Sequence, residues 1–178
     1  MASVCSFEEM TAAQQRSAGG KGGTLSRLYQ AGFSVPPGFV LLPTAFDGDQ
    51  VVPEAWAQAQ AYLERMRSDG VGTALAIRSS ALSEDSAQAS FAGEFETVLD
   101  VHTEETLREA VGCVRRSRRS KRVRAYSAVQ GVDAAHEMAV VVQRMVRADI
   151  SGVLFTVDPV TGNRASMTGN FVRGLGDQ

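Results

Sequence analysis

Apolar and polar positions along the chain follow two different periods, which predicts both helices and strands. Apolar residues recur at four-then-three spacing through residues 53–68, which indicates an amphipathic helix. A second stripe of this kind runs through residues 104–118, and Thr103 before it is a candidate N-cap. Trp56 and Met66 belong to the stripe of the first helix, so we expect both in the core.

Short apolar runs between polar or glycine-rich segments predict the strands. The predicted strands are 35–42, one that begins at Leu75, its return through 95–101, and then 138–146 and 150–157. We also expect a short helical turn within 44–50, a helix that ends near Gly131 and a turn at 158–162. Strands and helices mixed in this way predict an α+β fold, with a mixed or antiparallel sheet and helices packed on it. The length of residues 1–178 fits a single domain.

A glycine-rich segment with one lysine, Gly19–Gly23, lies near the start of the chain. Thr24 is a candidate N-cap for a helix through residue 31, and a glycine loop before a helix N-terminus favours anion binding. The segment lacks the Walker A spacing, and from these residues alone a flexible turn with an exposed Lys21 is the preferred interpretation. The helix is expected to turn Leu25 and Leu28 inward and to end at Gly32.

A polar loop of small residues joins the strand that begins at Leu75 to its return strand. Arg78 stands where the first strand opens into this loop, and its guanidinium offers a fork of donors suited to phosphate oxygens. Ser90, Phe91, Ala92 and Gly93 can bring backbone N–H groups close to a ligand, because Gly93 tolerates unusual dihedral angles. The loop therefore indicates an anion site, with a phosphate as the favoured ligand.

Gln143 is the one uncharged polar residue in the apolar run 138–146. An amide in a buried strand can satisfy a neighbouring backbone group, or it can donate to and accept from an adenine base. The residues alone leave both interpretations open.

Several segments together resemble the nucleotide-binding domain of the phosphoenolpyruvate synthase and pyruvate phosphate dikinase family. The resemblance rests on Gly20–Gly22 with Val35–Phe39, Ala76–Ala81, Ala89–Gly93 with Glu96 and Thr97, Val142–Val146, and Ser151–Gly162. That domain is similar to the ATP-grasp fold, and rifamycin phosphotransferases share it. The last residues, 170–178, resemble a segment in the middle of the family's domain, so the chain corresponds to the N-terminal portion of that domain.

The resemblance implies roles for the candidate residues. Lys21 and Arg78 would act on the nucleotide phosphates as the catalytic pair, and Gln143 would bond the base. The backbone at Met145 and Val146 would line the edge of the base. The remaining implied ATP-binding residues are Ser90, Phe91, Ala92, Gly93 and Thr97.

The resemblance also implies an activity. In the whole enzyme, ATP would phosphorylate a histidine with release of AMP and phosphate, and the phosphohistidine would pass its group to pyruvate or another acceptor. Mg²⁺ is implied as well, but the family's acidic metal ligands and its phosphohistidine domain are not in this sequence, so we assign no metal ligand. The expected partners are a nucleotide and a C-terminal half or partner chain with those parts. Three explanations of the chain remain open: it is a fragment, a truncated product, or one half of a split enzyme.

Two alternatives compete with the phosphoenolpyruvate synthase-like function. One is a rifamycin-type antibiotic phosphotransferase module, and the other is a non-catalytic module for nucleotide binding or subunit interaction. Phosphoryl transfer depends on neutralising charge, so the isolated chain is expected to be inactive without metal ligands. Because a half-domain leaves apolar surface exposed, the non-catalytic alternative predicts association.

Composition excludes several other classes. The net charge of −2 gives no general attraction to nucleic acid or anionic membranes, and no apolar run approaches the length of a membrane span. Cys5 and Cys113 lack metal-ligand spacing, and a reduced, cytoplasmic setting is expected. The basic run 115–124 could contact RNA, but no aromatic residues interleave with it, so a solvated helix end is preferred.

Overall fold

The computed structural model describes residues 2–67, 74–81, 85–86, 89–90, 96–119 and 138–175. The chain forms two compact units, residues 1–145 and residues 146–178, and each is described here by itself.

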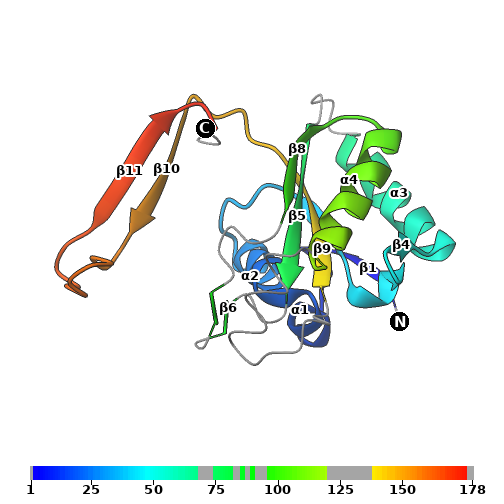
Figure 1. Cartoon of the computed structure of the whole chain (residues 1–178), viewed down its shortest axis with the longest axis horizontal. Helices are drawn as coiled ribbons and strands as arrows, with labels where there is room; N and C mark the ends of the chain where they lie inside the picture. The colour runs from blue at the N-terminus through cyan, green and yellow to red at the C-terminus, as the bar shows by residue number, and fades with distance from the viewer. Residues whose placement is uncertain are drawn as a thin grey trace. The chain divides into compact units, whose positions relative to one another are not determined.

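A five-stranded sheet forms the centre of the first unit (Figure 1). Its strands, in spatial order, are β1 (Val4–Ser6), β2 (Gly38–Leu41), β9 (Met138–Arg144), β5 (Leu75–Ala81) and β8 (Thr97–Val101). Every neighbouring pair in this order is antiparallel. Strand β9 lies in the middle and is buried from Met138 to Gln143, which explains why its sequence is almost continuously apolar. The predicted α+β class is confirmed, and the sheet is antiparallel.

Two helical layers cover the two faces of this sheet. Helix α2 (Gly19–Gln30) packs on β5 and β9, and α1 (Ala12–Ser17) packs against α2. Helices α3 (Pro53–Arg67) and α4 (Glu104–Ser117) cover the opposite face (Figure 1). The alternation of side chains along each strand supplies both cores. The core under α3 and α4 contains Ile77 and Val142, and the core under α1 and α2 contains Val40 and Val141.

The two long amphipathic helices were correctly predicted. Trp56, Leu63 and Met66 are buried along α3, as the four-then-three spacing requires. Thr103 caps α4 through a hydrogen bond that its hydroxyl accepts from the Thr106 N–H at 3.1 Å. The buried stripe supplies most of the stability of such helices, at about 1.5–3 kcal/mol for each large apolar side chain.

The predicted start of the second helix is wrong. Helix α2 begins at Gly19, so the glycine-rich segment is its first turn rather than a loop before Thr24. Gly22 and Gly23 are buried there, and a Cβ at Gly23 would lie only 2.4 Å from the Gln15 carbonyl oxygen of α1. Leu25 packs against the core as expected, whereas Leu28 is exposed. Gly32 ends the helix with a φ of +83°, as predicted.

Helix α1 was not predicted, although its start carries a recognisable signal. The Thr11 hydroxyl accepts a hydrogen bond from the Gln14 N–H, and the Gln14 side chain accepts one from the Thr11 N–H at 2.9 Å. This reciprocal capping box needs a polar residue at both positions, and the sequence supplies them.

The segment around residues 43–51 is a short 3₁₀ turn followed by a tight hairpin. The turn η1 spans Pro43–Ala45, and strands β3 (Phe46–Asp47) and β4 (Gln50–Val51) pair around Gly48. The helical turn predicted for 44–50 is therefore wrong beyond Ala45. A second small pair, β6 (Asp85–Ser86) and β7 (Ala89–Ser90), follows β5 in the chain.

The second unit is an antiparallel hairpin of β10 (Ile150–Phe155) and β11 (Thr168–Arg173). Strand β10 was predicted and β11 was not. The predicted turn follows β10, where Asp158 accepts hydrogen bonds from the N–H groups of Val160 and Thr161 at 2.8 and 3.0 Å. The helix predicted to end near Gly131 lies outside the described residues.

Candidate phosphate-binding site

The first turn of helix α2 lies directly against the end of strand β5. Gly19 has a φ of +74°, and a Cβ at this position would lie 2.4 Å from the Ser80 carbonyl oxygen. The Gly22 N–H donates to the Ser80 hydroxyl at 2.8 Å. Only glycine permits this approach at residue 19, so the glycine-rich sequence places the helix start on the strand.

Lys21 reaches from this first turn to the main chain of β5. Its ammonium donates a hydrogen bond to the Ser79 carbonyl oxygen at 2.9 Å, and the side chain is half-buried. Ser79 follows Arg78 directly in the strand. The structure therefore brings Lys21 to the main chain next to Arg78, the other predicted catalytic residue, from 57 positions earlier in the chain.

Arg78 lies on the face of the sheet that α2 covers. Ile77 belongs to the core under α3 and α4, and the alternation of the strand turns Arg78 and Ser80 to the other face. Arg78 is half-buried and makes no hydrogen bond or ion pair with any residue that the structure describes. Its register partner on β8 is Thr97, which was also a predicted site residue. Lys21, Arg78 and Thr97 thus supply two cations and a hydroxyl at one end of this face.

Gln143 lies on the same face of the sheet, one row away from Arg78. Val141 pairs with Arg78, and Gln143, two residues further along β9, pairs with Ala76. Its Nε2 donates to the Pro36 carbonyl oxygen at 3.1 Å, and the side chain is buried. This is the backbone-satisfying role that the sequence left open, and contact with a base stays a prediction.

Met145 and Val146, whose backbone was predicted to line the base, differ in their surroundings. The Met145 N–H donates to the Ala74 carbonyl oxygen at 2.9 Å, which extends the pairing of β9 with β5. Its sulfur accepts from the Asp100 N–H at 3.1 Å. Val146 is exposed and is the first residue of the second unit, so its place relative to Lys21 and Arg78 is not part of the described geometry.

The glycine-containing loop after β7 falls largely outside the described residues. Ser90 ends β7 and pairs with Asp85. Phe91, Ala92 and Gly93 lie outside the described residues, and their contact with a phosphate stays a prediction.

A known family model matches most of this chain. Residues 48–178 match the family model described as pyruvate phosphate dikinase, AMP/ATP-binding domain. The chain belongs to this family. The matched region includes Arg78 and Gln143, whereas Lys21 lies before it.

Individual relatives extend over the N-terminal part as well. A rifampicin phosphotransferase from a Streptomyces species is 35% identical over 98% of this chain and 24% of its own length. A phosphoenolpyruvate synthase from Aeropyrum pernix is 34% identical over 89% of this chain and 25% of its own length. A prodigiosin-synthesising transferase from Serratia marcescens is 33% identical over 89% of this chain and 20% of its own length. The chain thus spans about a quarter or less of the length of each of these three relatives.

A metal ion is implied by the family resemblance, and the described residues do not fit one. Within the ranges that the structure describes, no three histidine, cysteine, aspartate or glutamate side chains gather into a cluster that could hold a metal ion. We therefore derive no step through Mg²⁺. No helix among the same residues is long and apolar enough to span a membrane.

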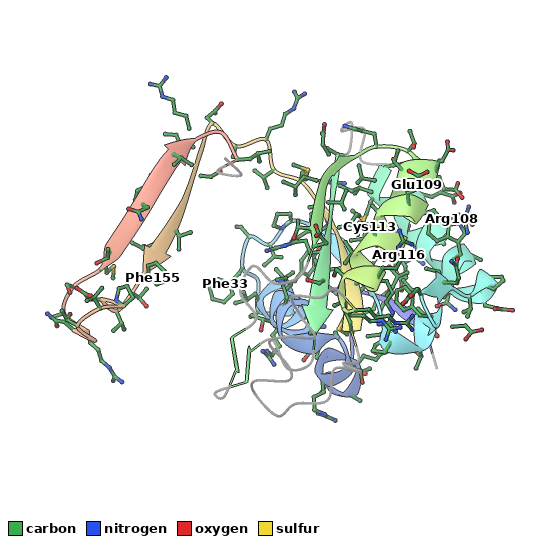
Figure 2. The ribbon with its side chains drawn as sticks, viewed as in Figure 1. Phe33, Arg108, Glu109, Cys113, Arg116 and Phe155 are labelled. Carbon is green, nitrogen blue, oxygen red and sulfur yellow. The ribbon has the colours of Figure 1, made fainter. Side chains whose placement is uncertain are left out.

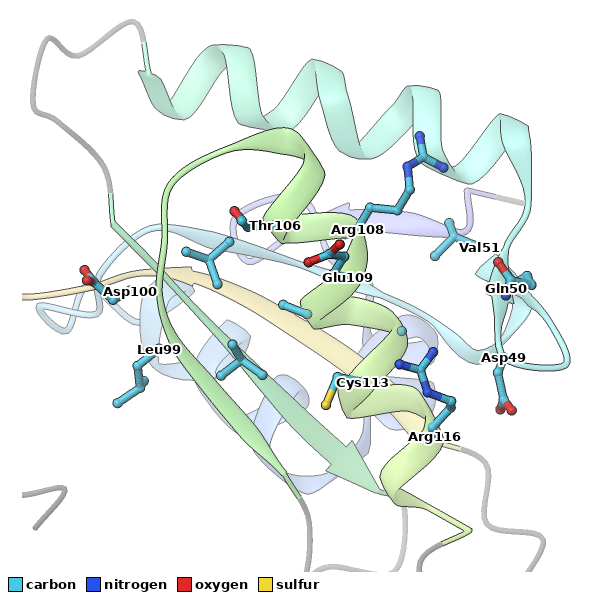
Figure 3. Close-up of a pocket in the computed structure, with 14 residues that line it drawn as sticks. Asp49, Gln50, Val51, Leu99, Asp100, Thr106, Arg108, Glu109, Cys113 and Arg116 are labelled. Carbon is cyan, nitrogen blue, oxygen red and sulfur yellow. The ribbon is translucent and has the colours of Figure 1, made fainter.

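A groove of about 740 Å³ lies away from the predicted site, between α4, β8 and the β3–β4 hairpin (Figure 3). Val98 lines it and pairs with Ile77, so the groove belongs to the α4 side of the sheet. Two arginines, Arg108 and Arg116, and three carboxylates, Asp49, Asp100 and Glu109, line it, which leaves no net preference for an anion. None of the predicted site residues lines this groove.

The basic run at the end of α4 is largely tied into the fold. Arg115 is buried, donates to the Met138 and Gly48 carbonyl oxygens, and lies 4.5 Å from the Phe46 ring centroid. Arg118 and Arg119 pair with Asp49 at 2.9 and 3.2 Å. Arg116 remains on the outer surface of the helix (Figure 2). The run does lie at the end of α4, but the predicted solvation is wrong for Arg115, which is buried, and residues 120–124 lie outside the described part.

Proposed function

We propose that the chain is the N-terminal portion of the ATP-binding domain of a phosphotransferase of the phosphoenolpyruvate synthase type. The observation that carries this proposal is the hydrogen bond from Lys21 to Ser79, which holds an ammonium beside the strand of Arg78. Two cations at one place on a sheet face suit the phosphates of a nucleotide. The family match over residues 48–178 supports ATP as that nucleotide.

The residues of this chain would bind and orient ATP. The Arg78 guanidinium would donate to phosphate oxygens in a fork, and Lys21 would exchange its carbonyl partner for a second set of oxygens. Gln143 would contact the base through its remaining hydrogen-bonding capacity, and Thr97 and the 90–93 loop would complete the phosphate contacts. In the whole protein, ATP would phosphorylate a histidine, with AMP and phosphate as products, and the acceptor would be pyruvate or another molecule. Mg²⁺ would neutralise further phosphate charge there, through ligands outside this chain.

Calorimetric titration of the chain with ATP, with and without Mg²⁺, tests the proposal. We expect the wild type to bind ATP in both conditions and Arg78→Ala to bind at least about tenfold more weakly. Arg27→Ala is the matched control, because it removes an exposed cation of α2 that bonds only Thr24 among the described residues. Equal ATP affinity of Arg78→Ala and the wild type would contradict the proposed site.

A rifampicin-type phosphotransferase is the second candidate, favoured by the Streptomyces relative at 35% identity. Both candidates use the same ATP site and differ in the acceptor. Assaying the full-length protein with pyruvate and with rifampicin separates them, because only one acceptor should be consumed together with ATP.

A non-catalytic subunit-interaction module is the third candidate, and the hairpin of the second unit favours it. Ile150, Leu154 and Phe171 lie on one face of the hairpin, Val153, Phe155 and Val172 lie on the other, and all six are exposed (Phe155 is labelled in Figure 2). Apolar side chains on both faces need cover that the unit itself does not supply. Sedimentation velocity tests association, and a monomer at high concentration argues against this candidate.

A further inference from the structure

The first turn of α2 lacks the main-chain hydrogen bond that opens the other helices of the described chain. In α1, α3 and α4 the fourth helical residue donates its N–H to the carbonyl oxygen of the residue before the helix. The three bonds are Gln15 to Thr11 at 2.8 Å, Trp56 to Val52 at 3.0 Å and Leu107 to Thr103 at 2.9 Å. In α2 the corresponding groups are the Gly22 N–H and the Ala18 carbonyl.

The hydroxyl of Ser80 joins these two groups instead. It accepts from the Gly22 N–H at 2.8 Å and donates to the Ala18 carbonyl oxygen at 2.6 Å. Ser80 has 0% of its surface exposed, so both bonds are shielded from water. A side chain of strand β5 therefore occupies the place of the first hydrogen bond of α2.

This insertion ties the glycine-rich turn to the strand of Arg78. Lys21 immediately precedes Gly22 in the helix, and Arg78 lies two residues before Ser80 on the same face of the strand. The approach also needs Gly19, where any Cβ would meet the Ser80 carbonyl. Helix α2 otherwise has no side-chain N-cap, so nothing else in the described chain satisfies its start in this way.

We propose that Ser80 is a positioning residue of the nucleotide-phosphate site, which sets Lys21 relative to Arg78 through its two hydrogen bonds to the start of α2. This inference rests on the proposed function. Ser80 does not itself contact the phosphates, since its hydroxyl is buried and both of its functions, donor and acceptor, are in use. Its removal would let the first turn of α2 re-form its own hydrogen bond and shift Lys21 away from Arg78.

The test is a double-mutant cycle in the chain, measured by calorimetric titration with ATP and with adenosine. Ser80→Ala is expected to weaken ATP binding about tenfold and to leave adenosine binding unchanged, because only the phosphates meet Lys21. In a Lys21→Met background the same Ser80→Ala change is expected to have no further effect on ATP affinity. If Ser80 had a purely structural role, the change in ATP affinity caused by Ser80→Ala would not depend on whether Lys21 is present.

Ser26→Ala is the matched control. Ser26 is also fully buried in α2, donates to the Phe7 carbonyl oxygen at 2.9 Å and accepts from the Gln15 amide at 3.1 Å. Its loss should lower thermal stability in the same way and leave ATP affinity unchanged. If Ser80→Ala does not fold, Ser80→Cys replaces it, because a thiol fills the site but donates and accepts weakly. If the variant that folds, Ser80→Ala or Ser80→Cys, binds ATP as tightly as the wild type, the inference is wrong.

The cycle separates the inference from the function on which it rests. Unchanged ATP affinity in both Lys21→Met and Arg78→Ala counts against the proposed function. If ATP binds those two variants more weakly, the proposed function stands. The role of Ser80 is then wrong if Ser80→Ala alone leaves ATP affinity unchanged, or if its effect on ATP affinity adds fully to that of Lys21→Met.

Discussion

The ammonium nitrogen of Lys21 lies 2.9 Å from the carbonyl oxygen of Ser79, the residue that follows Arg78 in strand β5. This bond joins a helix and a strand that are far apart in the sequence. An ammonium group carries three donors and a full positive charge. The same nitrogen is therefore suited to exchange the carbonyl oxygen for phosphate oxygens.

Lys21→Met is expected to weaken ATP binding by about 10- to 100-fold, the usual effect of losing a hydrogen bond to a charged group. Adenosine should bind the variant and the wild type equally, because it carries no phosphate. Titrations with ATP, AMP and adenosine check this. An equal loss for all three ligands would mean that Lys21 supports the fold of the site rather than the phosphates.

Gly19→Ala is expected to destabilise the fold by about 2–4 kcal/mol. The new Cβ would lie 2.4 Å from the Ser80 carbonyl oxygen, and the φ of +74° is itself unfavourable for alanine. Gly32→Ala is the matched control, because Gly32 has a φ of +83° and nothing lies within 4 Å of its added Cβ. Backbone strain alone should cost Gly32→Ala about 1 kcal/mol. Urea unfolding of both variants measures the difference, and equal losses would contradict the crowding at Gly19.

The elements with strong periodicity could be predicted from the sequence, because local pattern and tertiary packing agree there. The stripe through Trp56 and Met66 defines α3, and the apolar run of β9 belongs to a strand that is buried on both faces. Strand β11 was missed, since Gly169 and Asn170 interrupt its pattern.

The start of α2 could not be predicted, because local propensity and packing oppose each other. Four glycines near the start of a helix disfavour it, and packing against other elements, including a strand 58 residues later, compensates. The same contact explains why Ser80 was not recognised as part of the site. Arg78 was recognised from its side-chain chemistry and its family resemblance, whereas a buried serine has no distinguishing pattern in sequence.

The carboxylate of Glu9 is expected to make stability depend on acid pH. It accepts hydrogen bonds from the Tyr62 hydroxyl at 2.6 Å and the Ser6 hydroxyl at 3.0 Å, and with Arg65 nearby these lower its pKa from the ordinary value of 4.5. A lowered folded-state pKa means that this stabilisation is present above pH 4.5 and is lost as the pH falls through the lower folded-state value. Glu9→Gln should therefore lose less stability than the wild type over that range.

Thermal unfolding between pH 7 and pH 2.5 checks this expectation. Glu8→Gln is the control, since it removes an adjacent exposed carboxylate whose side chain has no hydrogen bond among the described residues. If the melting temperature of Glu9→Gln falls with decreasing pH as steeply as that of the wild type, the proposed role of Glu9 is wrong.

Tyr62 is expected to limit stability at alkaline pH. Burial, followed by its hydrogen bond to Glu9, raises the pKa of the Tyr62 hydroxyl to about 12. A raised folded-state pKa gives stability that is complete below the ordinary value of 10.0 and is lost as the pH rises toward 12. Tyr62→Phe should flatten the fall in melting temperature over that range. If the melting temperature of this variant falls with pH as steeply as that of the wild type, a group other than Tyr62 causes the alkaline loss of stability.

Arg115 and its neighbour Arg116 are expected to differ sharply, although both belong to the same basic run. Arg115 is buried, donates to the carbonyl oxygens of Met138 and Gly48, and stacks on the Phe46 ring. Arg115→Met should therefore cost about 2–3 kcal/mol, because it removes the guanidinium donor of the buried Met138 carbonyl group. Arg116→Met changes an exposed side chain and should stay within about 0.5 kcal/mol of the wild type. Urea unfolding compares the two variants, and binding of a single-stranded RNA at two salt concentrations tests the alternative role. A nucleic-acid surface predicts that both variants weaken a salt-dependent RNA affinity, whereas a helix end tied into the fold predicts a stability loss at Arg115 alone.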